Sequence, residues 1–300
     1  MTNHTFGVGS VLGQIDCDDA FDAAVTDYLR RSDRTTTAGH PHIGIEFRAQ
    51  PHDADPPGRL HIDMGRVKVF VDDGRAFVLV VDLAAGSFDL DTCHGVVHCA
   101  DTRPDRAWEA VHRVIRPLLG LGLARHGLHA LHAGAVGLDG AAALLIGPSG
   151  SGKSTATLRL TQAGARFIAD DTCYVDSTLQ VHGLADRSRV DPGGPVEVSG
   201  IDEPDGKIAT RTGRFDPGPT PVGAIVALRE PTGALDASSI MNSLLRTGTF
   251  GIDPPSDAQR LPTLSRLAET APGAAVGPRP NSLSLDALRS MLQRPGGGAQ

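Results

Sequence analysis

The chain has 300 residues and lacks several features that mark other classes of protein. It has no apolar run long enough to cross a membrane, and residues 1–5 lack the basic and apolar parts of a secretion signal. Its formal net charge is −7, which argues against the broad basic surface typical of nucleic-acid-binding proteins. We therefore expect a cytoplasmic protein that interacts with neither membranes nor nucleic acids.

Cysteine is also scarce, and its spacing argues against disulfides and zinc fingers. None of the four cysteines forms a C-x-x-C pair, so reduced thiols are the simplest interpretation. The segment Cys93-His94-Gly-Val-Val-His98-Cys99 gathers four possible metal ligands but lacks the usual zinc spacings. A short strand and turn is the favoured interpretation of this segment.

Lysine is the rarest of the basic residues. Only Lys68, Lys153 and Lys207 are lysines among the 28 basic residues, and the rest are arginines. Because a compact ammonium and a planar guanidinium are not interchangeable, a lysine kept in such a chain is informative. Lys153 lies in the motif described next. Lys207 is a candidate second phosphate contact, with an ordinary surface lysine as the alternative.

What the chain does contain is a complete phosphate-binding loop. The unbroken apolar run Ala141–Ile146 predicts a strand buried on both faces, and it ends in Gly147-Pro-Ser-Gly-Ser-Gly-Lys-Ser154, which matches G-x-x-x-x-G-K-S. Residues 155–163 then predict a helix whose N-terminus faces the phosphates. The residues expected to bind the phosphates of ATP are Gly147, Ser149, Gly150, Ser151, Gly152, Lys153, Ser154 and Thr155.

An acidic pair follows the loop at a short distance. Residues 166–169 predict a strand that delivers Asp170 and Asp171, and Asp170 is 17 residues beyond Lys153. One helix and one strand fit in this interval, so both carboxylates are expected beside the phosphate loop. One carboxylate could hold Mg²⁺ and the other could accept a proton from an attacking hydroxyl. The alternative is a solvated aspartate pair at the end of a strand.

The chain resembles the catalytic domain of HPr kinase/phosphorylase and the wider HPr-kinase-like proteins in three motifs. These motifs are His132-Ala-Gly-Ala-Val, GPSGSGKST and IADD. By position, His132 matches the family histidine, Lys153 and Ser154 match the phosphate-loop pair, and Asp170 and Asp171 match the acidic pair. The resemblance covers residues 128–171. It implies a fold akin to phosphoenolpyruvate carboxykinase, a Mg²⁺–nucleotide, and transfer to a hydroxyl such as that of serine. For His132 the alternative is a histidine packed in the core.

The chain departs from this family at one segment. The bifunctional enzymes carry E-x-x-G-x-G-I, linked to the reverse reaction and to subunit contacts, whereas residues 197–201 read Glu-Val-Ser-Gly-Ile and are too short. The chain is therefore more similar to kinase-only relatives, some of which are thought to modify peptide precursors. The sequence leaves the oligomeric state open, although hexamers are known in the bifunctional family and a homo-oligomer is one possibility.

The sequence predicts an α/β fold with two domains and a tail. Residues 1–125 are expected to form a smaller α+β domain, with helices over 18–31 and 105–125 and an antiparallel, hairpin-built sheet that includes a turn at Asp73-Gly74. Residues 126–294 are expected to form the P-loop kinase domain of the HPr kinase/phosphoenolpyruvate carboxykinase-like type. Residues 295–300 are expected to be a disordered tail.

The second predicted domain continues beyond the acidic pair. We expect His132 on a strand, a hairpin over residues 173–184 and a strand over 222–228. Helices are expected over 237–246, over 256–270 with an interruption at Pro262, and over 284–293 with Ser284 as its cap. Residues 187–216 are expected to be irregular. The cations of that segment that could reach a nucleotide are Arg187, Arg189, Lys207, Arg211 and Arg214.

These patterns favour an ATP- and Mg²⁺-dependent kinase acting on a serine of a small protein or peptide. Lys153 and Ser154 would hold the phosphates and Mg²⁺, Asp170 would be the base, Asp171 would support Mg²⁺, and His132 would orient the pair; the two aspartate roles could be exchanged. A metabolite hydroxyl is an alternative acceptor. A nucleotide-driven switch or assembly ATPase is an alternative class, although the chain lacks N-K-x-D and L-S-G-G-Q motifs.

Overall fold

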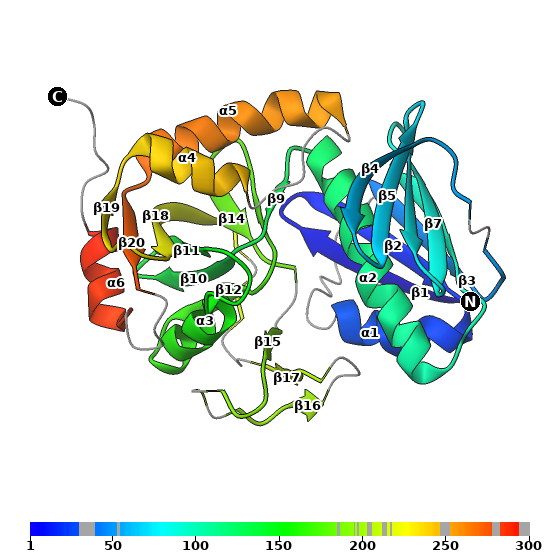
Figure 1. Cartoon of the computed structure of the whole chain (residues 1–300), viewed down its shortest axis with the longest axis horizontal. Coiled ribbons are helices and arrows are strands. Elements are labelled where there is room, and N and C mark those ends of the chain that lie inside the picture. The colour runs from blue at the N-terminus through cyan, green and yellow to red at the C-terminus, as the bar shows by residue number, and fades with distance from the viewer. Residues whose placement is uncertain are drawn as a thin grey trace. The chain divides into compact units, whose positions relative to one another are not determined.

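The structure, a computed structural model, divides into two compact units. One comprises Met1–Gly127 and Thr249–Asp257, and the other comprises Leu128–Gly248 and Ala258–Gln300 (Figure 1). The residues described are 1–29, 40–52, 55–184, 187–194, 196, 198–202, 206–211, 215–216, 218–246, 253–277 and 283–293. Within these ranges the fold is mixed α/β, with sheets of eight, nine and three strands. No helix in the described part of the chain is long and apolar enough to cross a membrane.

The first unit packs helices on an eight-stranded sheet of order β1-β2-β3-β8-β7-β6-β5-β4. Its strands are β1 (Thr2–Val8), β2 (Val11–Cys17), β3 (Ile43–Arg48), β4 (Arg59–Met64), β5 (Val67–Asp72), β6 (Arg75–Val80), β7 (Ala84–Asp89) and β8 (His94–His98). Its helices are the 3₁₀ turn η1 (Asp19–Phe21), α1 (Asp22–Leu29) and α2 (Pro104–Arg125). The apolar side of α2, including Val111, Val114 and Ile115, is fully buried.

Several local predictions for this unit are confirmed. Asp73 and Gly74 have φ of 35° and 76°, which is the two-residue turn that joins twisted antiparallel strands. The helix predicted over 105–125 is α2, and the helix predicted from residue 18 begins as η1 and continues as α1. The strand predicted around His94 is β8.

The prediction of a purely antiparallel sheet is wrong. β3 pairs in parallel with β2 on one side and with β8 on the other. The connection from β2 passes through η1 and α1, and a helical crossover returns the chain in the same direction. Alternating apolar residues identify strands but carry no information about the direction of the partner.

The second unit is built around β11 (Ala141–Ile146), which lies between β10 (Gly134–Leu138), antiparallel, and β18 (Thr220–Leu228), parallel. The rest of this nine-stranded sheet comprises β9 (His129–Leu131), β12 (Arg166–Ala169), β13 (Cys173–Val175), β14 (Gln180–His182), β19 (Gly233–Leu235) and β20 (Gly273–Val276). Residues 142–146 are fully buried, which confirms the predicted two-sided strand.

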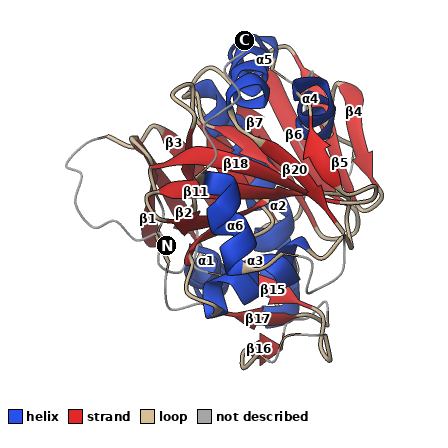
Figure 2. Cartoon of the chain, turned by 90° about the vertical axis from the view of Figure 1, so that its left-hand side faces the viewer, coloured by secondary structure: helices blue, strands red, loops and turns tan. Residues whose placement is uncertain are grey.

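Helices cover both faces of this sheet (Figures 1 and 2). They are α3 (Lys153–Gln162), α4 (Ala237–Leu245), α5 (Pro254–Thr270) and α6 (Leu285–Leu292). Ala143 and Leu145 of β11 pack in one apolar cluster with Leu160 of α3 and Leu288 of α6. Ser284 caps α6 as predicted, because its hydroxyl accepts the Ala287 amide at 3.1 Å.

Three predictions for the second unit need correction. Residues 187–216 are not wholly irregular, because β15 (Ser188–Val190), β17 (Ile208–Thr210) and β16 (Ile201–Asp202) form a small antiparallel sheet. These strands are too short to show a period in the sequence. His132 lies in a bend after β9, not on a strand. Helix α5 continues through Pro262, since the buried residues Leu264 and Leu267 of its next turn hold it against the core.

Other predictions fall outside the described residues or differ in their boundaries. Glu197, Arg214 and the tail at 295–300 lie outside the described ranges. The compact units meet in sequence at Gly127 and Leu128, and Thr249–Asp257 belongs to the first unit. The prediction assigned that segment to a single second domain spanning 126–294.

Candidate nucleotide and phosphoryl-transfer site

The phosphate loop connects β11 to α3 and is shaped by glycine. Gly150 and Gly152 have φ of 77° and 89°, in the left-handed region that side chains other than glycine rarely adopt. Gly152 is also the N-cap of α3, so the free amides of the first helical turn open at this loop. Such a curl followed by a helix N-terminus is a ready anion site, and the backbone here fits a nucleotide phosphate chain.

Gly147 has a packing role at the start of the loop. A Cβ added to Gly147 would lie 2.7 Å from the Ser151 hydroxyl and 3.0 Å from the Leu228 carbonyl oxygen. Ser151 is buried and its hydroxyl has no hydrogen-bond partner within the described residues. A larger residue at 147 would therefore push Ser151 and the loop away from β18.

Lys153 lies across the loop instead of extending into solvent. Its side chain is buried, and its ammonium donates hydrogen bonds to the carbonyls of Gly147 at 2.9 Å and Pro148 at 3.1 Å. An ammonium exchanges such neutral acceptors for phosphate oxygens with a net gain, because charge-assisted hydrogen bonds are the stronger ones. The residue types and the loop conformation thus fit a nucleotide phosphate.

Asp170 lies against the last residue of the motif. It follows β12, which pairs with β10, and the Ser154 hydroxyl hydrogen-bonds its carboxylate. Asp170 Oδ2 also accepts hydrogen bonds from the Ser188 hydroxyl at 2.7 Å and the Arg189 amide at 3.3 Å, while Oδ1 accepts the Asp171 amide at 3.0 Å. The structure therefore brings the acidic pair to the phosphate loop.

The environment of Asp170 opposes its ionisation. Burial raises the pKa of Asp170 above its ordinary value, and the charge of Asp171 raises the pKa further. The hydrogen bonds from Ser188, Ser154 and the Arg189 amide act in the opposite direction. These contacts hold the carboxylate in one orientation, and a nearby cation would stabilise its ionised form. Both features suit a group that supports Mg²⁺.

Asp171 has a different environment from its neighbour. It adopts φ of 68°, and its side chain is 39 % exposed. His132 Nδ1 lies 3.0 Å from Asp171 Oδ1 and 2.8 Å from the Asp171 carbonyl oxygen. Both partners are acceptors, which assigns the proton to Nδ1 and leaves Nε2 as an acceptor in the neutral imidazole. The imidazole therefore fixes the carboxylate of Asp171 without covering it.

Ser188 is the residue of this site that the sequence did not indicate. It is fully buried on β15, and its hydroxyl donates a hydrogen bond of 2.7 Å to Asp170. It lies in the stretch predicted to be irregular, 18 residues after Asp170, and no motif marks it. Lys207 directly precedes β17 of the same small sheet, and its role as a phosphate contact stays a prediction.

Comparisons with known proteins give little beyond these contacts. No protein-family model matches the sequence, and a search of the curated proteins finds no match. Among solved structures the chain is similar to the HPr(Ser) kinase/phosphatase from Coxiella burnetii, at 14 % identity and a TM-score of 0.31. The match covers 54 % of this chain and 91 % of that one.

Proposed function

We propose that this protein is an ATP- and Mg²⁺-dependent kinase that transfers the γ-phosphate to a hydroxyl, and that the acceptor is a serine of a small protein or peptide. The observation that carries this proposal is the position of Asp170 against Ser154 of the phosphate loop, with Asp171 and His132 beside it. Phosphoryl transfer needs an anion cradle, a metal-supporting carboxylate and a proton acceptor within one site. These residues supply all three.

The contacts favour one of the two role assignments that the sequence left open. Asp170 is held by Ser154, Ser188 and two backbone amides, so we assign it with Ser154 to the metal. Asp171 is more exposed and is oriented by His132, so we assign it to the acceptor hydroxyl. Mg²⁺–ATP, when bound, supplies the transferable group and neutralises part of its charge. This assignment reverses the first choice made from sequence.

The proton and the phosphoryl group then follow separate routes. The acceptor hydroxyl gives its proton to the Asp171 carboxylate while its oxygen forms a bond to the γ-phosphorus. The bond from that phosphorus to the bridging oxygen breaks, and its electron pair leaves with ADP. The hydrogen bond from His132 Nδ1 keeps Asp171 Oδ1 in place during the transfer. Lys153 and the loop amides hold the phosphate chain.

The test is phosphate transfer by the purified full chain from labelled ATP with Mg²⁺. The acceptors are a panel of serine peptides, small proteins and hydroxyl metabolites. We expect transfer to at least one peptide or protein. Transfer to metabolites alone would replace the acceptor class, and ATP hydrolysis with no acceptor in the panel would favour a nucleotide-driven switch.

Two aspartate variants separate the proposed roles. Asp171→Asn should lower kcat by about 10²- to 10⁴-fold, because it removes a proton acceptor, and should leave ATP affinity within about twofold. Asp170→Asn should instead raise the Mg²⁺ concentration needed for half-maximal rate. Asp286→Asn, at a side chain 93 % exposed on α6, is the matched control. Parent-like turnover by Asp171→Asn would contradict the base assignment.

A further inference from the structure

The first unit contains a separate group of side chains with metal-ligating atoms. His4 of β1, Cys17 at the end of β2 and Asp22 at the start of α1 each offer one ligand atom, and these three atoms lie within 4.8 Å of one another. His4 Nε2 is 2.9 Å from Asp22 Oδ1. No other group of three His, Cys, Asp or Glu side chains comes this close within the described ranges.

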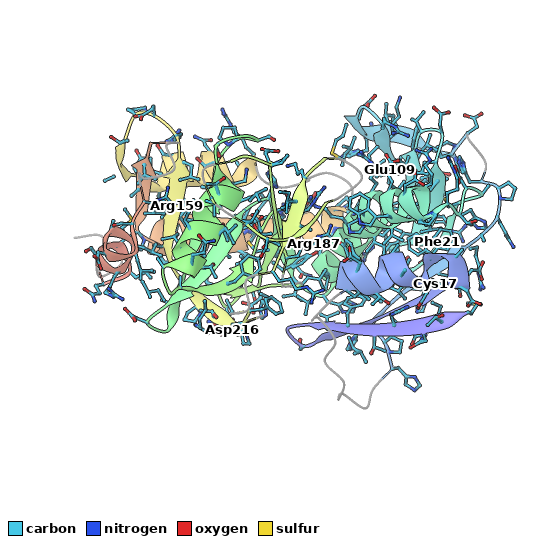
Figure 3. All side chains as sticks on the ribbon, turned by 90° about the horizontal axis from the view of Figure 1, so that it is seen from below. Cys17, Phe21, Glu109, Arg159, Arg187 and Asp216 are labelled. Carbon is cyan, nitrogen blue, oxygen red and sulfur yellow. The ribbon has the colours of Figure 1, made fainter. Side chains whose placement is uncertain are left out.

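The fold explains why residues so different in sequence position converge. In the β1–β2 hairpin His4 pairs with Ile15, so its side chain lies on the same face as Ile15 and Cys17. The turn η1 then brings the chain back over this face, anchored by the fully buried Phe21. Helix α1 therefore begins with Asp22 beside His4; Cys17 and Phe21 are labelled in Figure 3.

We propose that His4, Cys17 and Asp22 bind Zn²⁺ through imidazole nitrogen, thiolate sulfur and carboxylate oxygen. This mixture of donors is the one that zinc accepts in tetrahedral sites. Zinc–ligand bonds of about 2.0–2.3 Å place tetrahedral ligand atoms about 3.3–3.7 Å apart. The longest separation here, at most 4.8 Å, needs to close by about 1 Å, within reach of side-chain rotation.

The exposure of the three side chains fits a metal site with an open position. Cys17 is fully buried, whereas the His4 side chain is 17 % exposed and that of Asp22 is 46 % exposed. A metal can enter from the side of Asp22, and water would complete the coordination as in three-ligand zinc sites. Such an ion would join β1, β2 and α1 at one point, which gives the site a stabilising role.

The alternative of a reactive cysteine fits these residues less well. Burial raises the pKa of Cys17 to about 11, and the nearby carboxylates of Asp22, Asp18 and Asp16 contribute to the increase, while the N-terminal amino group opposes it. A thiol that keeps its proton in this way is a poor nucleophile. A divalent cation would displace that proton, as it does at zinc-bound cysteines generally.

The test is titration of the full chain, stripped of metal by a chelator, with Co²⁺ as a spectroscopic substitute for Zn²⁺. We expect a thiolate-to-cobalt charge-transfer band that saturates at one Co²⁺ per chain and is removed by Zn²⁺. Cys17→Ser should abolish the band, and Cys99→Ser, equally buried in the same unit, should leave it unchanged. His4→Gln should weaken Zn²⁺ affinity by at least about tenfold.

The titration of the parent protein decides the proposal even if a variant does not fold. Absence of the band in the folded parent, or a band that survives Cys17→Ser and disappears in Cys99→Ser, would overturn it. Circular dichroism of each variant identifies those that are folded. A rise in the melting temperature of the parent with Zn²⁺, absent in Cys17→Ser, would support the stabilising role.

Discussion

Two regions of the second unit meet at Asp170, and they contribute in different ways. Residues 147–154 offer glycine-shaped amides and the ammonium of Lys153, which are groups that bind anions whatever the pH near neutrality. Strand β15 offers one hydroxyl and one amide, both directed at a carboxylate. The groups proposed to bind the nucleotide and the strand contacts of Asp170 therefore lie on separate segments, so separate substitutions can alter them.

The largest effect is expected at the phosphate loop. Lys153→Ala removes the buried ammonium that bonds the loop carbonyls, so ATP affinity should fall by about a hundredfold and transfer should be lost. Titration calorimetry with Mg²⁺–ATP measures the change. Lys68→Ala, which removes a surface lysine paired with Asp63 at 3.5 Å, is the control and should bind ATP as the parent does.

The second prediction concerns His129, a buried histidine whose protonation should affect the stability of the second unit and not phosphate transfer. His129 on β9 is 1 % exposed, and neither ring nitrogen has a hydrogen-bond partner within the described residues. Burial lowers the pKa of His129 to about 4, with a contribution from Arg260 and opposition from Asp176. The unfolded chain binds this proton near the ordinary value of 6.5, so stability falls as the pH drops from about 6.5 towards 4.

The expected loss attributable to His129 is about 2 kcal/mol between about pH 7.5 and pH 5. His129→Leu should remove that part of the pH dependence, as measured by urea unfolding at both values. The pH profile of phosphate transfer should not change, because no hydrogen bond of the His129 ring links it to Asp170 or Asp171 within the described residues. If His129→Leu also shifted the pH profile of phosphate transfer, then stability and transfer would depend on the same proton, which would contradict this prediction.

The smallest effect is expected on strand β15. Ser188→Ala removes a hydrogen bond that favours ionised Asp170, so the pKa of Asp170 should rise further. Activity that needs this carboxylate ionised is lost as the pH falls through its pKa, and the loss should therefore begin at a higher pH. ATP affinity at alkaline pH should stay within about twofold.

The conservative variant controls this last test. Ser188→Thr keeps the hydroxyl and should return the acid limb of the pH–rate profile towards that of the parent. A rate loss in Ser188→Ala that is equal at every pH would indicate a packing defect. It would contradict the prediction that Ser188 acts through the pKa of Asp170.

The sequence predicts the strand, loop and helix around the phosphate loop well, because these parts are contiguous in the chain. The strand, the glycine-rich loop, the helix and the acidic pair all lie within residues 141–171, and their order along the chain nearly determines their order in space. Ser188 could not be predicted in this way. Its contact with Asp170 depends on β15 pairing with β17, and strands of three residues leave no periodic signal.

The same limit explains the errors elsewhere. The parallel partners of β3 and the uninterrupted α5 are both set by tertiary packing, which overrides what local patterns favour. The roles of the two aspartates were open for a related reason. Adjacent identical residues can be distinguished only by what surrounds them, and the sequence does not show that Asp170 contacts Ser154 and Ser188 while Asp171 contacts His132.

The left-handed backbone of Asp171 restricts which residues can replace it. Aspartate, asparagine and glycine tolerate such a conformation best, whereas bulkier or branched residues strain the chain there. A mutation that removes the carboxylate and still permits folding will therefore tend to leave asparagine or glycine behind. Under the proposed function, descendants of this sequence that retain the phosphate loop but carry either residue at 171 would lack the proposed base and keep the groups proposed to hold a nucleotide.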